Sequence, residues 1–363
     1  MSILFFILML FHGLIHIMGW LKSFGFAEIN AITQGIPKII GVFWLFATLL
    51  FVFVAVSYLL KMEWWIIPAV IAVMTSQILI LMTWQDAKFG TIPNIIIFIA
   101  IIIGFSVWRF NYQVDLDLRK MNNSNFSTKE IQIITEETIT PLPLPVQKWV
   151  HNIGLIGREK VNSVYFKQKG KMKLKPDQEK WYDAVAEQYI TTDDPAFLWK
   201  VKMDMFPFVS VAGRDFFING EGRMLMKIGS LIPVVNVTNN KKVNQSTLQR
   251  YLMELPWYPS AALNDYINWE SIDGNTAKAT MNYKGTTGSA IYYFNENGEL
   301  LKISALRFKE SDKNAERIEC IGEVKENNVV NGVKIPTKLN VSWVLGEEVF
   351  TWYKLEIYDV EFR

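Results

Sequence analysis

Two side chains that suit anion binding or acid–base chemistry lie four residues apart, at Arg250 and Glu254. The planar guanidinium of an arginine can donate paired hydrogen bonds to a carboxylate or a phosphate, and a carboxylate can act as a general acid or base. Residues four apart are neighbours on one face of a helix. Three interpretations follow: a solvated surface pair, a buried ion pair, and a site for an anionic head group.

His12 and His16 have the same spacing within the first apolar stretch of the chain. Polar side chains inside a bilayer suggest ligation of a metal or haem, a proton relay or head-group contact. Two nitrogens are too few for a structural zinc, and no Cys, Asp or Glu lies at membrane depth to complete the site. We therefore expect neutral imidazoles that pair with Thr75 or Gln77 on a neighbouring helix, and no metal or other cofactor.

Signatures of known catalytic families are absent from the sequence. It has no Walker A, HExxH, GxSxG or CxxC motif, and Gly220-Glu-Gly222 is only a fragment of a dinucleotide fingerprint. Cys320 is the only cysteine, which excludes an internal disulfide framework and a zinc ribbon. His151 is the only histidine outside the first apolar stretch. Because no nucleophile has a visible base, we expect a binding protein and not an enzyme.

The helix that carries Arg250 is predicted within residues 244–259. Ser246 and Gln249 have the spacing of a capping box, so the helix is expected to start near Thr247. Pro256 should end it, because the residue before a proline avoids the helical conformation. The helix also has an apolar stripe with helical spacing, which must cover another apolar surface: Leu248, Tyr251, Leu252 and Leu255.

Four apolar runs fill the first third of the chain, at residues 3–20, 39–60, 64–83 and 92–108. Each has about the 20 residues needed to cross a bilayer, and none contains a charged residue. The sequence therefore predicts a four-helix transmembrane domain over residues 1–111 of a multi-pass membrane protein. Basic residues are nearly balanced between alternate loops, so charge leaves the orientation open.

The polar remainder begins with residues 112–140, which are predicted to form a tether. Residues 1–111 hold five of the 37 basic and three of the 35 acidic residues, so residues 112–363 hold 32 of each. This neutral balance argues against a nucleic-acid partner.

Residues 141–363 have the alternation of a sheet with one wet face. An example is the run in which Phe197, Trp199, Val201 and Met203 alternate with Lys200 and Lys202. Asn-Gly or Asp-Gly pairs at 219–220, 273–274, 297–298 and 331–332 predict hairpin turns. The alternation changes phase near Tyr358, which suggests a bulge. We predict an α+β domain in which about ten antiparallel strands form a curved half-barrel sheet with one covering helix.

Several of these residues together resemble a family of uncharacterised bacterial membrane-anchored proteins with a domain of unknown function. The most specific part is Arg250-Tyr-Leu-Met-Glu254 followed by Trp257-Tyr-Pro259. Other residues that carry the resemblance are Leu142-Pro-Leu-Pro, Gln168, Trp181, Gln188, Phe197-Leu-Trp199, Asp215 and Trp269. More loosely, residues 294–300 and 331–336 are similar to the terminal strands of LolA-like lipoprotein carriers. Such half-barrels hold lipid or acyl chains between a curved sheet and helical plugs.

The carrier resemblance implies a binding module at the bacterial cell envelope, anchored in the inner or plasma membrane with its sheet domain outside the cytoplasm. Its ligand would be a membrane lipid or another hydrophobic molecule. The candidate site residues come from the motif of the uncharacterised family and are Arg250, Glu254, Trp257, Asp215 and Trp199, although the two tryptophans also suit an ordinary core. One alternative is an envelope enzyme that uses Asp215, Glu254 and Arg250 as acid, base and anion clamp. Another is a structural or signalling partner of an unidentified membrane protein.

Overall fold

Apolar residues form long helices at the start of the chain, where each backbone hydrogen bond can be made within one segment. The computed structural model describes residues 2–123, 131–206 and 209–363. Within these residues, four stretches are long and apolar enough to cross a membrane: Ile3–Ser23, Lys38–Leu59, Glu63–Met82 and Trp84–Met121. The four predicted apolar helices are thus confirmed.

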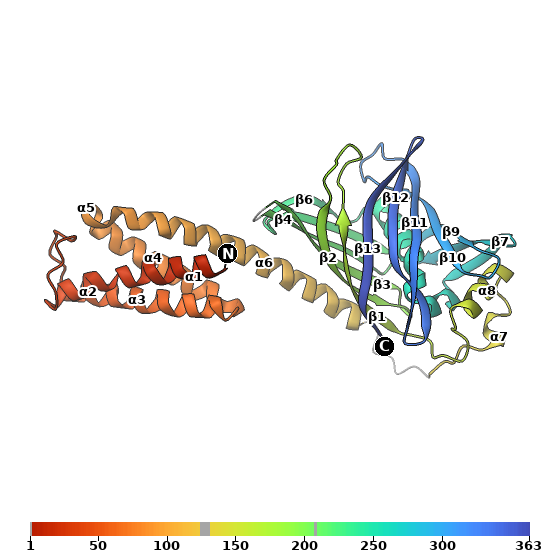
Figure 1. Cartoon of the computed structure of the whole chain (residues 1–363), viewed down its shortest axis with the longest axis horizontal. Coiled ribbons are helices and arrows are strands. Elements are labelled where there is room, and N and C mark those ends of the chain that lie inside the picture. The colour runs from red at the N-terminus through yellow and green to blue at the C-terminus, as the bar shows by residue number, and fades with distance from the viewer. Residues whose placement is uncertain (1, 124–130, 207–208) are drawn as a thin grey trace. The chain divides into compact units, whose positions relative to one another are not determined.

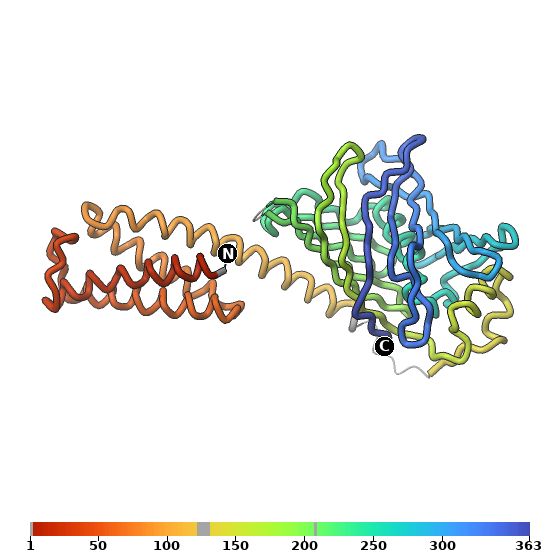
Figure 2. The backbone as a smooth tube through the Cα atoms, viewed as in Figure 1, coloured from red at the N-terminus to blue at the C-terminus, as the bar shows by residue number. Residues whose placement is uncertain are grey.

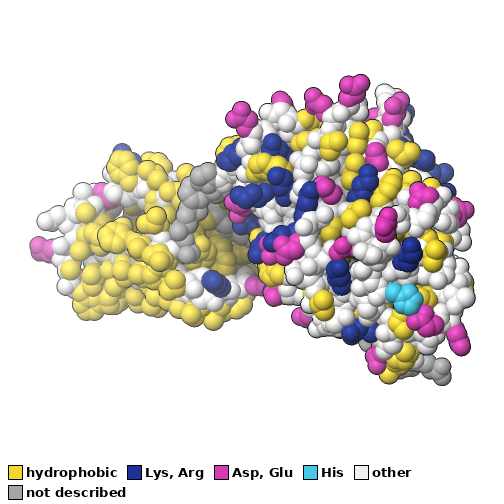
Figure 3. Space-filling model, turned by 45° about the vertical axis from the view of Figure 1, so that its right-hand side comes forward, with side chains coloured by type: hydrophobic (Ala, Val, Ile, Leu, Met, Phe, Trp, Pro, Cys, Tyr) yellow, Lys and Arg dark blue, Asp and Glu magenta, His cyan; other side chains and the backbone are white. Residues whose placement is uncertain are grey.

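The chain folds as two units, Met1–Asn111 and Tyr112–Arg363. The visible face of the first unit is covered largely by hydrophobic side chains (Figure 3). Leu4, Ile39 and Phe89 are 72%, 73% and 72% exposed, a pattern that suits contact with acyl chains. The helical elements are α1 (Ser2–Ile15), α2 (Ile17–Ser23), α3 (Lys38–Leu59), η1 (Glu63–Trp65), α4 (Ile66–Met82), α5 (Trp84–Ala87), η2 (Lys88–Gly90) and α6 (Thr91–Asn123).

The end of α6 differs from the expected tether. Residues 112–123 continue the helix, and Val114, Asp117 and Met121 are buried at helical spacing. Asp117 pairs with Arg214 of the sheet described below. The polar composition of this stretch concealed that stripe. Of the remaining expected tether, Glu136–Ile139 form α7, and residues 124–130 lie outside the described residues.

Thirteen strands within the described residues form one antiparallel sheet in the second unit (Figure 1). They are β1 (Ser163–Met172), β2 (Tyr182–Thr191), β3 (Ala196–Phe206), β4 (Val209–Ile218), β5 (Glu221–Ile228), β6 (Ile232–Val237), β7 (Ile267–Asp273), β8 (Thr276–Tyr283), β9 (Thr286–Phe294), β10 (Leu300–Phe308), β11 (Arg317–Val330), β12 (Val333–Leu345) and β13 (Glu348–Phe362). The helical elements of this unit are α8 (Leu144–Asn152), α9 (Lys241–Glu254), η3 (Leu255–Trp257) and η4 (Pro259–Leu263).

The sheet consists of two meanders, β1 to β6 and β7 to β13, which join where β1 pairs with β13. It curls into a half-barrel (Figure 2), as predicted, with β6 and β7 as its edges. The expected number of about ten strands was too low. The edge strand β6 and its neighbour β5 are only partly covered, so they lack a clear alternation of buried and exposed residues.

Each of the four predicted turns joins two consecutive strands. Asn219 and Gly220 have φ of 53° and 78°, and Asn331 and Gly332 have φ of 47° and 79°. Two successive positive φ values are those of the tight turn that Asn-Gly favours. The predicted bulge is also present, because the β1–β13 register shifts next to Tyr358.

The covering helix α9 begins earlier than predicted. Asn240 caps it, and its side chain accepts hydrogen bonds from the backbone N–H groups of Lys242 and Val243 at 2.9 and 3.2 Å. The predicted cap Ser246 lies inside the helix, where its hydroxyl exchanges hydrogen bonds with the backbone of Phe308 in β10. The end is as predicted, since α9 stops at Glu254, two residues before the proline.

One face of α9 is part of the core. All four residues of the predicted stripe, Leu248, Tyr251, Leu252 and Leu255, are fully buried. Two glycines let the helix approach the sheet on both flanks, since a Cβ at Gly222 or Gly288 would lie within 2.4 or 2.6 Å of its side chains. Residues of α9 outside this stripe, among them Arg250, Met253 and Glu254, border a cavity on the concave side of the sheet.

Candidate functional site

A cavity of about 460 Å³ lies between α9 and the concave side of the half-barrel. This volume is within the range of roughly 300–1,000 Å³ that is typical of small-molecule sites. The lining includes all five residues predicted from the sequence: Arg250, Glu254, Trp257, Asp215 and Trp199. Both meanders and α9 contribute to the wall, so the fold assembles the cavity from segments far apart in the chain.

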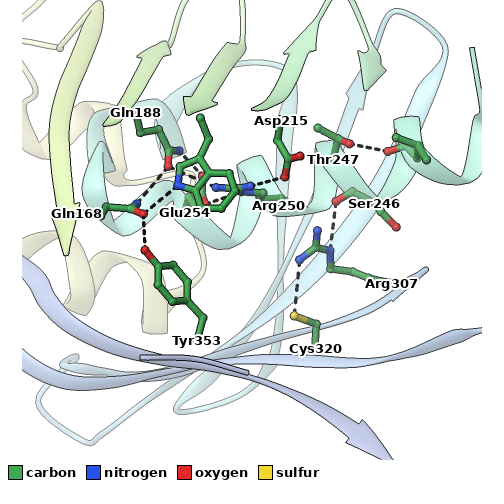
Figure 4. Close-up of polar contacts among 12 residues, drawn as sticks. Gln168, Gln188, Asp215, Ser246, Thr247, Arg250, Glu254, Arg307, Cys320 and Tyr353 are labelled. Atoms are coloured by element: carbon green, nitrogen blue, oxygen red, sulfur yellow. Dashed lines mark hydrogen bonds and ion pairs between the residues drawn. The ribbon is translucent and has the colours of Figure 1, made fainter. Parts of the chain in front are cut away.

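Arg250 and Glu254 of α9 form an ion-pair triad with Asp215 of β4 (Figure 4). Nε of Arg250 donates to Oε1 of Glu254 at 2.8 Å, and Nη1 donates to Oδ2 of Asp215 at 2.7 Å. The three side chains are 12–16% exposed. Of the three interpretations of the Arg250–Glu254 pair, the structure has the buried ion pair, and it brings Asp215 into it.

Trp199 of β3 lies next to the triad and contacts Arg250. It is the cross-strand partner of Asp215 in the β3–β4 pair, so both side chains point to the same face of the sheet. The Arg250 guanidinium lies 4.6 Å from the centroid of the indole ring, a cation–π distance. The predicted site residue Trp199 thus stacks against the guanidinium of Arg250.

Two glutamines and a tyrosine extend the network (Figure 4). Nε2 of Gln188 donates to Glu254 at 2.5 Å, and Nε2 of Gln168 donates to Gln188 at 3.3 Å. Oε1 of Gln168 accepts from the indole of Trp199 at 2.9 Å and from the hydroxyl of Tyr353 at 3.0 Å. We did not predict the glutamines as site residues. The signal was their place at inward-facing strand positions, where a polar side chain must be hydrogen-bonded.

The triad holds more negative than positive charge, because two carboxylates share one guanidinium. Burial raises the pKa of the Asp215 carboxyl above its ordinary value, and the nearby arginines oppose the rise only in part. For Arg250, burial alone would lower the pKa, but Glu254 and Asp215 together outweigh it and raise the pKa. Oδ1 of Asp215 is buried without a hydrogen-bond partner among the described residues. This oxygen is the one carboxylate atom of the triad left for a ligand.

Trp257 has a structural place in the cavity wall. Its indole N–H donates to the backbone carbonyl of Pro336 at 3.0 Å, and its ring packs edge-to-face on Phe166 at 5.0 Å. A tryptophan fixed in this way contributes apolar surface to the cavity and holds η3 against β12.

Arg307 of β10 is a second arginine in the cavity, and the sequence analysis did not identify it. Its Nε donates to the carbonyl of Ser246 at 3.2 Å, and Nη1 lies 3.6 Å from the sulfur of Cys320 (Figure 4). Among the described residues, no carboxylate oxygen lies within 4 Å of it. Its inward position, in line with the buried Ile303 and Ala305, was the available signal.

Space inside the cavity depends on Gly322 of β11. A Cβ there would meet only Met253 at 3.9 Å and a backbone oxygen at 4.0 Å. The loop after β10 closes one side, and Asn240 and Lys242 at the start of α9 hold that loop through hydrogen bonds of 2.9–3.0 Å to its carbonyls. A larger residue at position 322 would therefore enter the cavity without a backbone clash.

The membrane histidines form a hydrogen-bonded cluster, as expected, but with other partners. Nε2 of His12 contacts Asn94 at 2.9 Å, and Nε2 of His16 contacts Ser76 at 2.9 Å. The predicted partners were Thr75 and Gln77. Ser76, which lies between them, contacts the histidines instead. In the part of the chain that the structure describes, no group of three His, Cys, Asp or Glu side chains could hold a metal ion.

Residues 140–362, more than half of the chain, match a family described as a family of unknown function, DUF6920. No curated protein matches the chain. The likeness of the last strands to LolA-like carriers is not part of this match and stays a prediction.

Proposed function

Because the chain belongs to the DUF6920 family, whose description gives no activity, we propose a function from its geometry: a membrane-anchored module that binds a hydrophobic ligand. The observation that carries this proposal is the cavity of about 460 Å³ between α9 and the half-barrel. Four helices that are long and apolar enough to cross a membrane precede the module, which supports its attachment to a bilayer. A lipid or another apolar molecule from that membrane is the ligand that suits such a site.

The lining of the cavity supports a ligand that is mainly apolar. Met253 of α9 and Leu339, Val341 and Trp343 of β12 all line the space. Gly322 of the neighbouring strand β11 places no side chain in this space, and an added Cβ would have only Met253 and a backbone oxygen within 4 Å. Apolar surface that faces unfilled space lacks contacts that a bound aliphatic chain would supply.

The test fills the cavity from within. We expect Gly322→Leu in the full chain, purified in mild detergent, to lose a lipid species that mass spectrometry detects with the wild-type protein. Gly274→Leu is the matched control, because a Cβ at Gly274 has nothing within 4 Å. If the two variants and the wild type carry identical lipids, the binding proposal is wrong.

We also propose that the half-barrel lies outside the cytoplasm. The support for this orientation is the resemblance of residues 294–300 and 331–336 to the strands of envelope carriers. The basic residues of the loops do not favour either orientation, because they are nearly balanced. A reporter fused after Arg363 that is active only in an extracytoplasmic compartment is the expected result. Activity confined to the cytoplasm would overturn this orientation.

An enzyme is the second candidate, because Asp215 lines the cavity and its Oδ1 is a buried acceptor without a partner among the described residues. Glu254 is less suited to a base, since its two oxygens accept from Arg250 and Gln188. Binding alone predicts the same lipids in Asp215→Asn as in the wild type. Accumulation of a larger, uncleaved precursor in Asp215→Asn would instead support the enzyme.

A further inference from the structure

We propose that the ligand is a single-chain amphiphile with one anionic group, such as a fatty acid, and that Arg307 binds this group. The inference rests on the proposed function, because it names the chemistry of the molecule in the same cavity. It also assigns a different task to the two arginines: Arg250 holds the half-barrel together, and Arg307 recognises the ligand.

Arg250 is unsuited to an anionic ligand. Two of its nitrogens already donate to Glu254 and Asp215 at 2.8 and 2.7 Å. An anion placed there would be a third negative charge around one guanidinium, in a site with little water to screen the repulsion. Anion binding at Arg250 would therefore require one carboxylate to leave the triad.

Arg307 has the properties that Arg250 lacks. No carboxylate oxygen among the described residues lies within ion-pair distance, although Arg307 is near enough to lower the pKa of Asp215. Its Nε and Nη1 contact a carbonyl and a thiol, which are neutral groups, and Nη2 donates to none of the residues that the structure describes. An arginine can donate five hydrogen bonds, so Arg307 has donors left for a carboxylate or a phosphate.

The surroundings of Arg307 favour an anion over a neutral polar group. Its guanidinium carbon lies 5.6 Å from the centroid of the Trp343 ring, a cation–π distance. Lys309, two residues on, lines the same cavity and forms an ion pair with its neighbour Glu310 on the exposed loop. Lys309 and Glu310 thus balance each other, and Arg307 is left without a carboxylate in ion-pair contact among the described residues, which one anionic group would supply.

The rest of the cavity fits an aliphatic chain. Beyond Arg307, the cavity is lined by uncharged residues of β11, β12 and β13: Gly322, Val341, Leu339 and Leu355. The volume of about 460 Å³ is in the lower part of the range of roughly 300–1,000 Å³ for small-molecule sites. It therefore suits one chain better than the two chains of a phospholipid.

The test uses the full chain in nanodiscs of a neutral phospholipid and three photoreactive probes. These are hexadecanoic acid and hexadecanol with a diazirine in mid-chain, and phosphatidylglycerol with the same group in one acyl chain. After irradiation, labelled peptides of β10 to β12 are quantified relative to labelled peptides of the membrane helices. We expect the acid to label the cavity at about a tenfold lower concentration than the alcohol or the phospholipid, the difference that one charged hydrogen bond supplies.

Arg307→Gln should raise the concentration of acid needed for labelling about tenfold or more and leave labelling by the alcohol unchanged. The alcohol thus reports that the cavity is intact in the variant. Arg317→Gln is the matched control, since Arg317 is an exposed arginine in β11 that does not line the cavity. It should leave the labelling by both probes unchanged.

The outcomes separate the two proposals. Equal labelling by acid and alcohol in the wild type would overturn the anionic ligand, as would an unchanged preference in Arg307→Gln. Loss of both probes in Arg307→Gln would show that Arg307 only supports the wall. Stronger labelling by the phospholipid would overturn the single-chain assignment. If no probe labels the cavity of the wild type and Gly322→Leu makes no difference, the proposed function itself fails.

Discussion

Nη1 of Arg250 lies 2.7 Å from Oδ2 of Asp215, although 35 residues separate the two positions in the chain. This contact joins the helix α9 to strand β4 in the wall of the cavity. Glu254 completes the triad from the next turn of the same helix, so one guanidinium organises both the helix and the first meander.

Replacement of Arg250 by alanine should destabilise the second unit by about 3–5 kcal/mol, because it leaves two buried carboxylates without their cation. Denaturant unfolding of the full chain, followed by tryptophan fluorescence, measures the change. Arg223→Ala is the control: its pair with Glu221 spans 3.4 Å and is more exposed, so we expect a loss under about 1 kcal/mol. Equal losses in the two variants would contradict the buried triad.

Asp215→Asn should be at least as stable as the wild type at neutral pH. The pKa of Asp215 is raised above its ordinary value of 3.8, so the folded state binds the proton more tightly than the unfolded state. In the wild type, the protonated Asp215 side chain therefore makes its full contribution to the stability of the fold below pH 3.8. This contribution is lost as the pH rises through the pKa of Asp215 in the folded state. The advantage of the variant should then shrink on acidification. Melting temperatures across this pH range test it, with the exposed Asp204→Asn as control, and an advantage that grows on acidification would refute it.

Leu252→Ala should cost roughly 2–5 kcal/mol, the usual loss for a buried leucine. Leu252 is fully buried in the stripe of α9 that packs on the core. The same unfolding measurement applies to Leu301→Ala in β10, where the side chain is 47% exposed and the loss should stay within about 0.5 kcal/mol. A loss of that small size in Leu252→Ala would mean that α9 does not cover the sheet.

Gly222→Ala should destabilise the second unit by about 1–3 kcal/mol through overpacking. The added Cβ would lie 2.4 Å from the hydroxyl oxygen of Thr247 and 2.9 Å from the carbonyl oxygen of Val243, a backbone atom that cannot turn aside. Gly274→Ala adds the same atom in open space and should be neutral. Thermal unfolding of both variants distinguishes them, and a neutral Gly222→Ala would show that the helix has room to move.

The sequence by itself determined the local features of this protein. The four apolar runs needed only length and hydropathy, and Asn219-Gly220 needed only the positive φ that Asn and Gly tolerate. The stripe of Leu248, Tyr251, Leu252 and Leu255 needed only helical spacing. These signals are confined to neighbouring residues, so they survive without knowledge of the fold.

The tertiary structure decided which distant side chains meet. Asn240 caps α9, and Ser246, the expected cap, instead donates its hydroxyl to the backbone of Phe308 in β10. Gln168 and Gln188 join the triad only because β1, β2 and β3 lie side by side. Likewise, Arg307 has no carboxylate within ion-pair distance among the described residues, because Arg250 has bound Asp215 and Glu254. Pairing between strands and the burial of charge depend on contacts across the whole sheet, which no local pattern encodes.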